Sequence, residues 1–322
     1  MNFLEIKANE PVVLEMSGDR PEQVHLFDKD SIDAVNAALA ARRPLLIRGE
    51  PGVGKSQLAR AVAKVLKRAF IAYVVDAQAE ARDLLCHFDA VQRLAEAQLG
   101  QALGADADAM KKELKVDNYL YPGPLWWAFN WTDAQTQAGE VRQSPPPQFG
   151  DCSHTNGCVL LIDEIDKAEM DLPNGLLEAL GEGRFTPLGR KEPVCVSGVP
   201  PLVIITTNGE RALPNAFLRR CLVLHLDLFG GELKPLDTLV KRGKAHFPEL
   251  DDEKVIRPAA ELLLNDRSKA EEDKRQPLPG QAEFLDLLRA VRNLADDGKG
   301  EPAEFISKVA QYIMNKQAGA RV

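Results

Sequence analysis

Residues 49–56 have the types and spacing of a phosphate-binding loop, because the sequence GEPGVGKS fits the pattern G-x-x-x-x-G-K-[ST]. Its members are Gly49, Glu50, Pro51, Gly52, Val53, Gly54, Lys55 and Ser56, and Gln57 follows as a further candidate for nucleotide contact. The glycines let backbone N–H groups surround phosphates at the start of a helix. Lys55 would reach the β- and γ-phosphates, and Ser56 would offer a hydroxyl to Mg²⁺. The competing interpretation, a chance glycine turn, is disfavoured because a strand pattern precedes the loop and a helical pattern follows it.

Two adjacent carboxylates, Asp163 and Glu164, follow the apolar run 159–162. At the end of a strand, such a pair can divide two tasks. Asp163 would orient Mg²⁺ and its water shell, and Glu164 would polarise the water that attacks a γ-phosphate. The alternative is a solvated turn that happens to begin with two acids.

Three more polar side chains follow later apolar runs. Asn208 ends the run 202–207 and could hold the attacking water or sense the γ-phosphate; its alternative role is to form a turn before Gly209. Arg219 and Arg220 end a short helical pattern just before the last strand pattern. They would either complement the helix dipole or supply an arginine finger to the nucleotide of a neighbouring subunit.

The elements that must position these residues follow from five short apolar runs at 45–47, 71–75, 159–162, 202–205 and 222–226. Continuous apolar runs are typical of strands that are covered on both faces. Separated by helical stretches, they predict an α/β fold with a parallel P-loop sheet sandwiched by helices. The sequence also predicts a helix capped by Ser31 and an amphipathic helix over 81–103.

The remaining segments predict an insertion and a second domain. Residues 132–157 are polar and proline-rich, and we expect them to form a mobile loop within an insertion at about 81–157. After residues 229–231, only helical patterns follow. We therefore expect a nucleotide-binding domain over 1–228 and a small all-helical lid over 229–322. The last two helical patterns predict these buried residues: Phe284, Leu287, Leu288, Val291, Phe305, Val309, Tyr312 and Ile313.

Composition narrows the functional classes. The 322 residues carry a net charge of −8, which disfavours nucleic acid and anionic lipid as partners. No apolar run has the length of a membrane span, and residues 1–5 do not resemble a secretory signal. Five cysteines without a C-x-x-C pair favour a reducing compartment. We therefore expect a cytoplasmic protein with no membrane partner.

Two other groups of side chains are weaker candidates for a binding site. Cys152, His154 and Cys158, with Asp151, could hold zinc, although their spacing matches no familiar pattern. The aromatic residues of 126–131 could stack on bases. Because residues 120–140 contain no basic side chain, we expect these aromatics to pack inside the protein or at a subunit contact.

The ordered segments GEPGVGKS, LLIDEIDKA, TTN and LPNAFLRRC together resemble an AAA+ ATPase. Within that class, the segments GPLWWA at 123–128, LLEAL at 176–180 and EGRF at 182–185 are similar to the MoxR-like and dynein-related group. The resemblance covers roughly residues 30–295.

The resemblance implies ATP and Mg²⁺ as ligands, Lys55 and Ser56 in the Walker A loop, and Asp163 and Glu164 in Walker B. It also implies Asn208 as sensor 1 and Arg220, with Arg219 as a substitute, as the finger. One departure is that Gln281 stands where a sensor-2 arginine is expected.

At the level of the whole protein, the resemblance implies a ring, predicted to be a homo-hexamer, that remodels a protein partner such as one with a von Willebrand factor A domain. A nucleotide-dependent switch or scaffold with little turnover and a GTP-using relative stay as alternatives.

Overall fold

The computed structural model describes residues 3–14, 23–169, 171–228, 234–275, 277–296 and 300–313. They form two compact units. The sheet unit comprises residues 1–6, 30–48 and 56–224, and the helical unit comprises residues 7–29, 49–55 and 225–322. The predicted junction at 229–231 lies outside the described residues. None of the helices in the described ranges has the length and apolar character that crossing a membrane requires.

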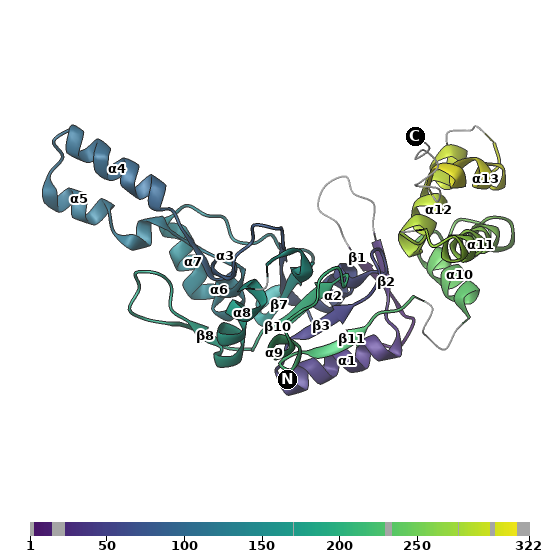
Figure 1. Ribbon diagram of the computed structural model, residues 1–322, viewed down its shortest axis with the longest axis horizontal. Helices are drawn as coiled ribbons and strands as arrows, with labels where there is room; N and C mark the ends of the chain where they lie inside the picture. Colours follow the sequence, from purple (N-terminus) through teal and green to yellow (C-terminus); the bar gives the residue numbers. More distant parts are fainter. Residues whose placement is uncertain are drawn as a thin grey trace. The chain divides into compact units, whose positions relative to one another are not determined.

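The sheet unit is built on a five-stranded parallel sheet with the order β11-β3-β10-β7-β4 (Figure 1). Its strands are β3 (Leu45–Arg48), β4 (Arg68–Val74), β7 (Ser153–Asp163), β10 (Leu202–Thr207) and β11 (Leu222–His225). The register sets Ile204 of the central strand opposite Leu45 on one side and Leu161 on the other. The predicted α/β fold with a parallel sheet is confirmed.

Both faces of this sheet are covered, which explains its continuous apolar strands. Leu160 and Ile162 of β7 belong to the same buried cluster as Trp126 and Trp127. Leu161, which points to the opposite face, is also buried. Because successive side chains alternate between the faces of a strand, a run with every residue apolar indicates that neither face meets water.

The helices of the sheet unit include the following elements: α1 (Lys29–Ala41), α2 (Lys55–Val65), α3 (Ala81–Leu85), α4 (Ala90–Ala102), α5 (Ala107–Glu113), α6 (Pro124–Phe129), α7 (Trp131–Glu140), α8 (Asp171–Glu182) and α9 (Asn215–Leu218). Short 3₁₀ helices lie at η1 (Val116–Tyr119) and η2 (Ile165–Lys167). Two antiparallel ribbons pair β5 (Cys86–Phe88) with β6 (Leu120–Pro122), and β8 (Arg184–Phe185) with β9 (Val194–Cys195).

Two helix predictions need correction. Ser31 does not cap α1, because the helix begins at Lys29 and Ser31 is buried inside its first turn. The single helix predicted over 81–103 is interrupted by β5, whose pairing with β6 takes Cys86–Phe88 out of the helix. The outer piece, α4, has no buried residue and lies with α5 at the end of the sheet unit distant from α1 (Figure 1).

The aromatic segment packs inside the sheet unit, as the absence of basic neighbours predicts. Trp126 is fully buried, and its indole N–H donates to Asp133 at 2.7 Å. Gly123 precedes this helix where a Cβ would lie 2.8 Å or less from the carbonyl oxygens of Asp83 and Leu84. Glycine is therefore required there because α3 and α6 approach each other closely.

The expectation of a mobile loop over 132–157 is wrong for most of its length. Residues 131–140 form α7, and residues 153–157 belong to β7. The pattern misleads because the buried side chains of α7 are small or polar. Gln137 is 1% exposed: its amide donates to the carbonyls of Asp117 and Leu120 and accepts from Arg190.

Replacing Gln137 by alanine should destabilise the fold by about 1–3 kcal/mol, because two backbone carbonyls would lose a donor in a buried setting. The matched control is Gln135→Ala on the exposed face of α7, which should change the free energy of unfolding by less than about 0.5 kcal/mol. Urea unfolding followed by tryptophan fluorescence measures both. Equal, negligible effects would show that the segment is mobile after all.

In the helical unit, β1 (Pro11–Leu14) pairs with β2 (Gln23–Leu26) in antiparallel orientation. Its helices are α10 (Pro235–His246), the π-helical η3 (Asp252–Ile256), α11 (Arg257–Glu272), α12 (Gln281–Asp296) and α13 (Pro302–Ile313). The predicted core residues of α12 are buried, as is Phe305. Tyr312, in contrast, is 80% exposed, because α13 turns Ile306 and Ala310 inward instead. Residues 314–322 lie outside the described residues.

Candidate functional site

The glycine loop connects β3 to α2, as its motif requires. Gly52 and Gly54 have positive φ angles of 79° and 97°, which L side chains rarely adopt. The ammonium of Lys55, only 7% exposed, donates to the carbonyls of Gly49 at 2.7 Å and Glu50 at 2.9 Å. The lysine therefore lies folded along its own loop, with its charge among backbone oxygens.

Within the helical unit, the same loop contacts α11 and α12. The guanidinium of Arg267 binds both carboxylate oxygens of Glu50, at 2.9 and 3.0 Å, and also donates to the Pro279 carbonyl. A Cβ on Gly52 would lie 2.8 Å from the Cβ of Ala282. These contacts tie the loop to the start of α12, a role for Arg267 that the sequence analysis did not identify.

In the sheet unit, three hydroxyl and carboxylate groups meet where β7 and β10 end. The Ser56 hydroxyl lies 2.8 Å from both carboxylate oxygens of Asp163, and Thr206 donates to the same carboxylate at 2.5 Å. Mg²⁺ prefers oxygen ligands and is commonly held by one or two protein groups together with phosphates. Ser56 and Asp163 therefore fit the donor set that the motif requires.

Glu164 follows Asp163 in a left-handed backbone conformation, with φ 60° and ψ 49°. Such a conformation is uncommon for a residue with a side chain, and it is frequent at functional sites. The Glu164 N–H donates to the Thr206 hydroxyl at 2.8 Å. Its carboxylate accepts from the Asn208 amide at 3.3 Å and pairs with the Lys167 ammonium at 2.5 Å. The structure thus brings together Asp163, Glu164 and Asn208.

Asp166 holds the two turns of this cluster together. Its side chain is 2% exposed and accepts the backbone N–H groups of Asn208 at 3.2 Å and Glu210 at 2.9 Å. The turn after β7 and the turn after β10 are therefore joined by a buried carboxylate. Asp166, Lys167 and Thr206 were visible only as parts of longer motifs, and nothing in their spacing indicated these roles.

The two candidate finger arginines lie just after α9, and both side chains are exposed. Arg43 holds their backbone, because its guanidinium donates to the carbonyl of Arg220 at 3.0 Å and to the carbonyl of Arg219. The backbone is therefore held in place at this point, while the two arginine side chains remain exposed to solvent. Among the described residues of the sheet unit, neither arginine forms a hydrogen bond or ion pair with Glu164 or Asp163, so the structure does not bring them into that cluster.

His154 and Cys152, two of the possible zinc ligands, contact other residues instead of one another. His154 stacks on Trp131 with a centroid separation of 5.1 Å, and Cys152 approaches the Ala63 carbonyl. Burial raises the pKa of Cys158 to about 12, which opposes the thiolate form that binds metals. In the ranges that the structure covers, no three His, Cys, Asp or Glu side chains gather as a metal site.

The region around the missing sensor-2 arginine is occupied by local contacts. Gln281 is 6% exposed, and its side-chain oxygen has no hydrogen-bond partner. Arg275 pairs with Asp273, and Arg289 pairs with Asp286. These two arginines, which flank Gln281 in the sequence, would each have to leave a carboxylate in order to take the place of a sensor-2 arginine.

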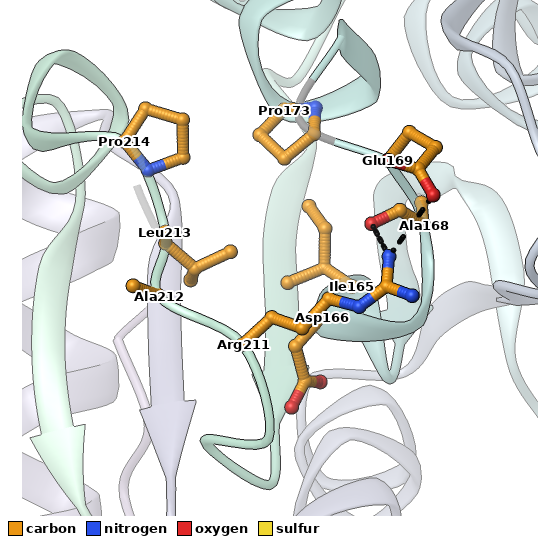
Figure 2. A pocket seen from close by; sticks show the side chains of 9 residues that line it. All are labelled: Ile165, Asp166, Ala168, Glu169, Pro173, Arg211, Ala212, Leu213 and Pro214. Carbon is orange, nitrogen blue, oxygen red and sulfur yellow. Dashed lines mark hydrogen bonds and ion pairs between the residues drawn. The ribbon is translucent and has the colours of Figure 1, made fainter.

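A cavity of about 230 Å³ lies between the turn 165–169 and the loop 211–214. Figure 2 shows Arg211 bonded to the Ala168 carbonyl and the Glu169 carboxylate, both at 3.3 Å. Because Asp166 also lines it, this cavity adjoins the turns that carry Glu164 and Asn208.

Comparisons with known proteins give one family and several solved structures. The family model described as "AAA domain (dynein-related subfamily)" matches residues 44–221. No curated protein matches the chain. A Thermotoga maritima RuvB point mutant is 17% identical, with 89% of this chain and 69% of that chain covered and a TM-score of 0.47. The Thermotoga maritima RuvB Holliday junction branch migration motor is 17% identical, with 88% and 67% covered and a TM-score of 0.45.

Proposed function

We propose, from the premise that the chain belongs to the AAA domain family (dynein-related subfamily), that it binds ATP with Mg²⁺ and hydrolyses it. The observation that carries the proposal is the cluster at the ends of β7 and β10. There, Ser56 and Thr206 hold Asp163, and Glu164 lies within reach of Asn208. A metal-orienting carboxylate, a base and an amide at one sheet edge are the groups that phosphoryl transfer to water requires.

The glycine loop would bind the phosphates through its backbone N–H groups, and Lys55 would contact the β- and γ-phosphates. Ser56 and Asp163 would hold Mg²⁺, which neutralises phosphate charge when bound. Glu164 would accept a proton from the attacking water, and Asn208 would orient that water. Arg220 would be supplied to a neighbouring subunit's nucleotide.

We extend the proposal to a MoxR-like homo-hexameric ring that remodels a protein partner, with a von Willebrand factor A-domain protein as the candidate client. Support for a ring comes from Arg219 and Arg220, whose side chains are exposed and whose backbone is held by Arg43. A low-turnover switch is the second candidate function, and it is favoured by the engagement of both Glu164 carboxylate oxygens.

Replacing Lys55 by alanine should weaken ATP binding at least tenfold, because the phosphates would lose their principal positive contact. Isothermal titration calorimetry with Mg-ATP measures the effect, and Mg-GTP in parallel tests the GTP-using alternative. Lys64→Ala, nine residues further along α2, is the matched control and should bind ATP normally. Unchanged affinity in folded Lys55→Ala protein would contradict the assignment of the loop.

A further inference from the structure

The glycine loop is held at two points within the helical unit. The guanidinium of Arg267, on α11, binds the two carboxylate oxygens of Glu50 at 2.9 and 3.0 Å. At the second point, a Cβ added to Gly52 would lie 2.8 Å from the Cβ of Ala282, in the first turn of α12. Because these two contacts lie on either side of Pro51, they restrain the first half of the loop against both helices.

Arg267 is a firmly held cation. Its side chain is 12% exposed, whereas the side chain of Glu50 is 51% exposed. It also donates to the Pro279 carbonyl at 3.0 Å and pairs with Glu271 at 3.1 Å. Burial lowers the pKa of Arg267, but the bonds and charges of Glu50 and Glu271 outweigh burial and raise that pKa. The guanidinium therefore stays charged, and its bidentate contact with Glu50 fixes the geometry of the pair.

Glu50 brings a negative charge into a loop that would bind a triphosphate. The motif surrounds the phosphates with backbone N–H groups and with the Lys55 ammonium. Because glutamate is ionised at neutral pH, a carboxylate in the same loop repels the anion that these groups attract. The bidentate pair places a full positive charge beside that carboxylate and cancels most of its effect on the phosphates.

The bond to Glu50 does little for the helical unit itself. An ion pair with a half-exposed partner contributes little to folding. Arg267 would also keep Glu271 and the Pro279 carbonyl as partners if Glu50 were absent. The consequence of the pair therefore falls on the glycine loop, which has a carboxylate to neutralise and a backbone to hold in place.

We infer that Arg267 is a positioning residue for nucleotide binding, because it holds the glycine loop through Glu50 and neutralises a carboxylate that would otherwise repel the triphosphate. This inference rests on the proposed function, since it concerns the phosphate-binding loop of that reaction. Arg267 acts through Glu50 and does not itself contact phosphate. The affinity of the loop for phosphate thereby depends on a residue 217 positions away.

The test measures the affinity of the full chain for Mg-ATP by isothermal titration calorimetry. Arg267→Met should weaken binding roughly tenfold, because the loop loses a charged bidentate bond and keeps a bare carboxylate. Adding Glu50→Gln to that variant removes the carboxylate as well and should recover most of the loss. Arg257→Met is the matched control and should bind as the parent does, because Arg257 also lies on α11 but pairs with Glu253.

Two further measurements separate this role from a role in folding. Raising the salt concentration should reduce the difference in affinity between the parent and Arg267→Met, because the exposed carboxylate is screened at high ionic strength. Melting temperatures without nucleotide show whether Arg267→Met is folded. If it is not, Arg267→Gln keeps a donor for the Pro279 carbonyl and should show the same loss of affinity and the same recovery with Glu50→Gln.

Parent-like affinity in folded Arg267→Met would overturn the inference. A loss that Glu50→Gln does not recover, or that persists unchanged at high salt, would overturn it too, because Arg267 would then contact the nucleotide itself or act only on the fold. A parent chain that binds no Mg-ATP would contradict the proposed function and this inference together. A parent chain that binds Mg-ATP without hydrolysing it would contradict the proposed hydrolysis alone, since the inference is tested entirely by binding.

Discussion

Replacing Glu164 by glutamine is expected to leave ATP binding intact and to lower the hydrolysis rate by roughly 10²–10⁴-fold. Glutamine has nearly the same shape as glutamate, and its side-chain oxygen can still accept from the Asn208 amide. It cannot take a proton from water at neutral pH. Asp163 should keep its bonds to Ser56 and Thr206 in this variant, so the proposed magnesium ligands should be undisturbed.

Phosphate release measures the rate, and calorimetry with Mg-ATP measures the affinity. Glu169→Gln is the control, because Glu169 is 77% exposed and pairs with Arg211 rather than with Asp163 or Asn208. Wild-type turnover by Glu164→Gln would remove Glu164 as the base. Loss of ATP binding would show instead that Glu164 helps to hold the metal or the nucleotide. The variant that binds without hydrolysing would also serve as a trap for a protein client.

The sheet was predictable because its strands are continuous runs of apolar residues. A strand covered on both faces has no polar positions, so runs such as 159–162 and 202–205 are distinct in the sequence. Parallel strands end at a common edge, and this brings Asp163 and Asn208 together once their strands are neighbours. The proximity of these residues could therefore be predicted from their position at strand ends.

The elements within the insertion were only partly predictable, for a related reason. The helix α7 buries Ala134, Gln137 and Ala138, which are small or polar and give little apolar periodicity. Its burial depends on partners distant in sequence, such as Arg190. Similarly, the strand β5 that interrupts the predicted helix over 81–103 exists only because β6 pairs with it. Tertiary pairing outweighed local pattern in both places.

The side-chain contacts around the site could not be predicted from the sequence, for a third reason. Lys167 pairs with Glu164, whose backbone is left-handed, and no sequence pattern indicates that conformation. The bidentate bond between Arg267 and Glu50 joins residues 217 positions apart. A motif specifies residue types over a short span, so the side chains that constrain a motif from outside it become visible only in the fold.

Replacing Arg220 by alanine is expected to lower hydrolysis by roughly 10³–10⁵-fold while leaving ATP binding and assembly intact. The transferred phosphoryl group spreads negative charge over its oxygens, and a guanidinium supplied by a neighbouring subunit would stabilise that charge. An arginine that only complements the α9 dipole contributes well under about 1 kcal/mol when exposed. The two roles therefore predict effects of very different size. Arg184→Ala, which removes another exposed arginine, is the control and should keep its turnover.

Mixed rings provide the sharper test of a shared site. Arg220→Ala and Glu164→Gln subunits should each be inactive alone. A ring containing both can place an intact Glu164 in one subunit beside an intact Arg220 from the next, so mixing should restore part of the activity. Co-assembly must be shown independently, for example by pull-down of differently tagged subunits. If the mixed subunits co-assemble but do not hydrolyse ATP, Arg220 acts within its own chain or the ring needs every site at once. Wild-type turnover by Arg220→Ala alone would exclude it from the site and leave Arg219 to be tested in its place.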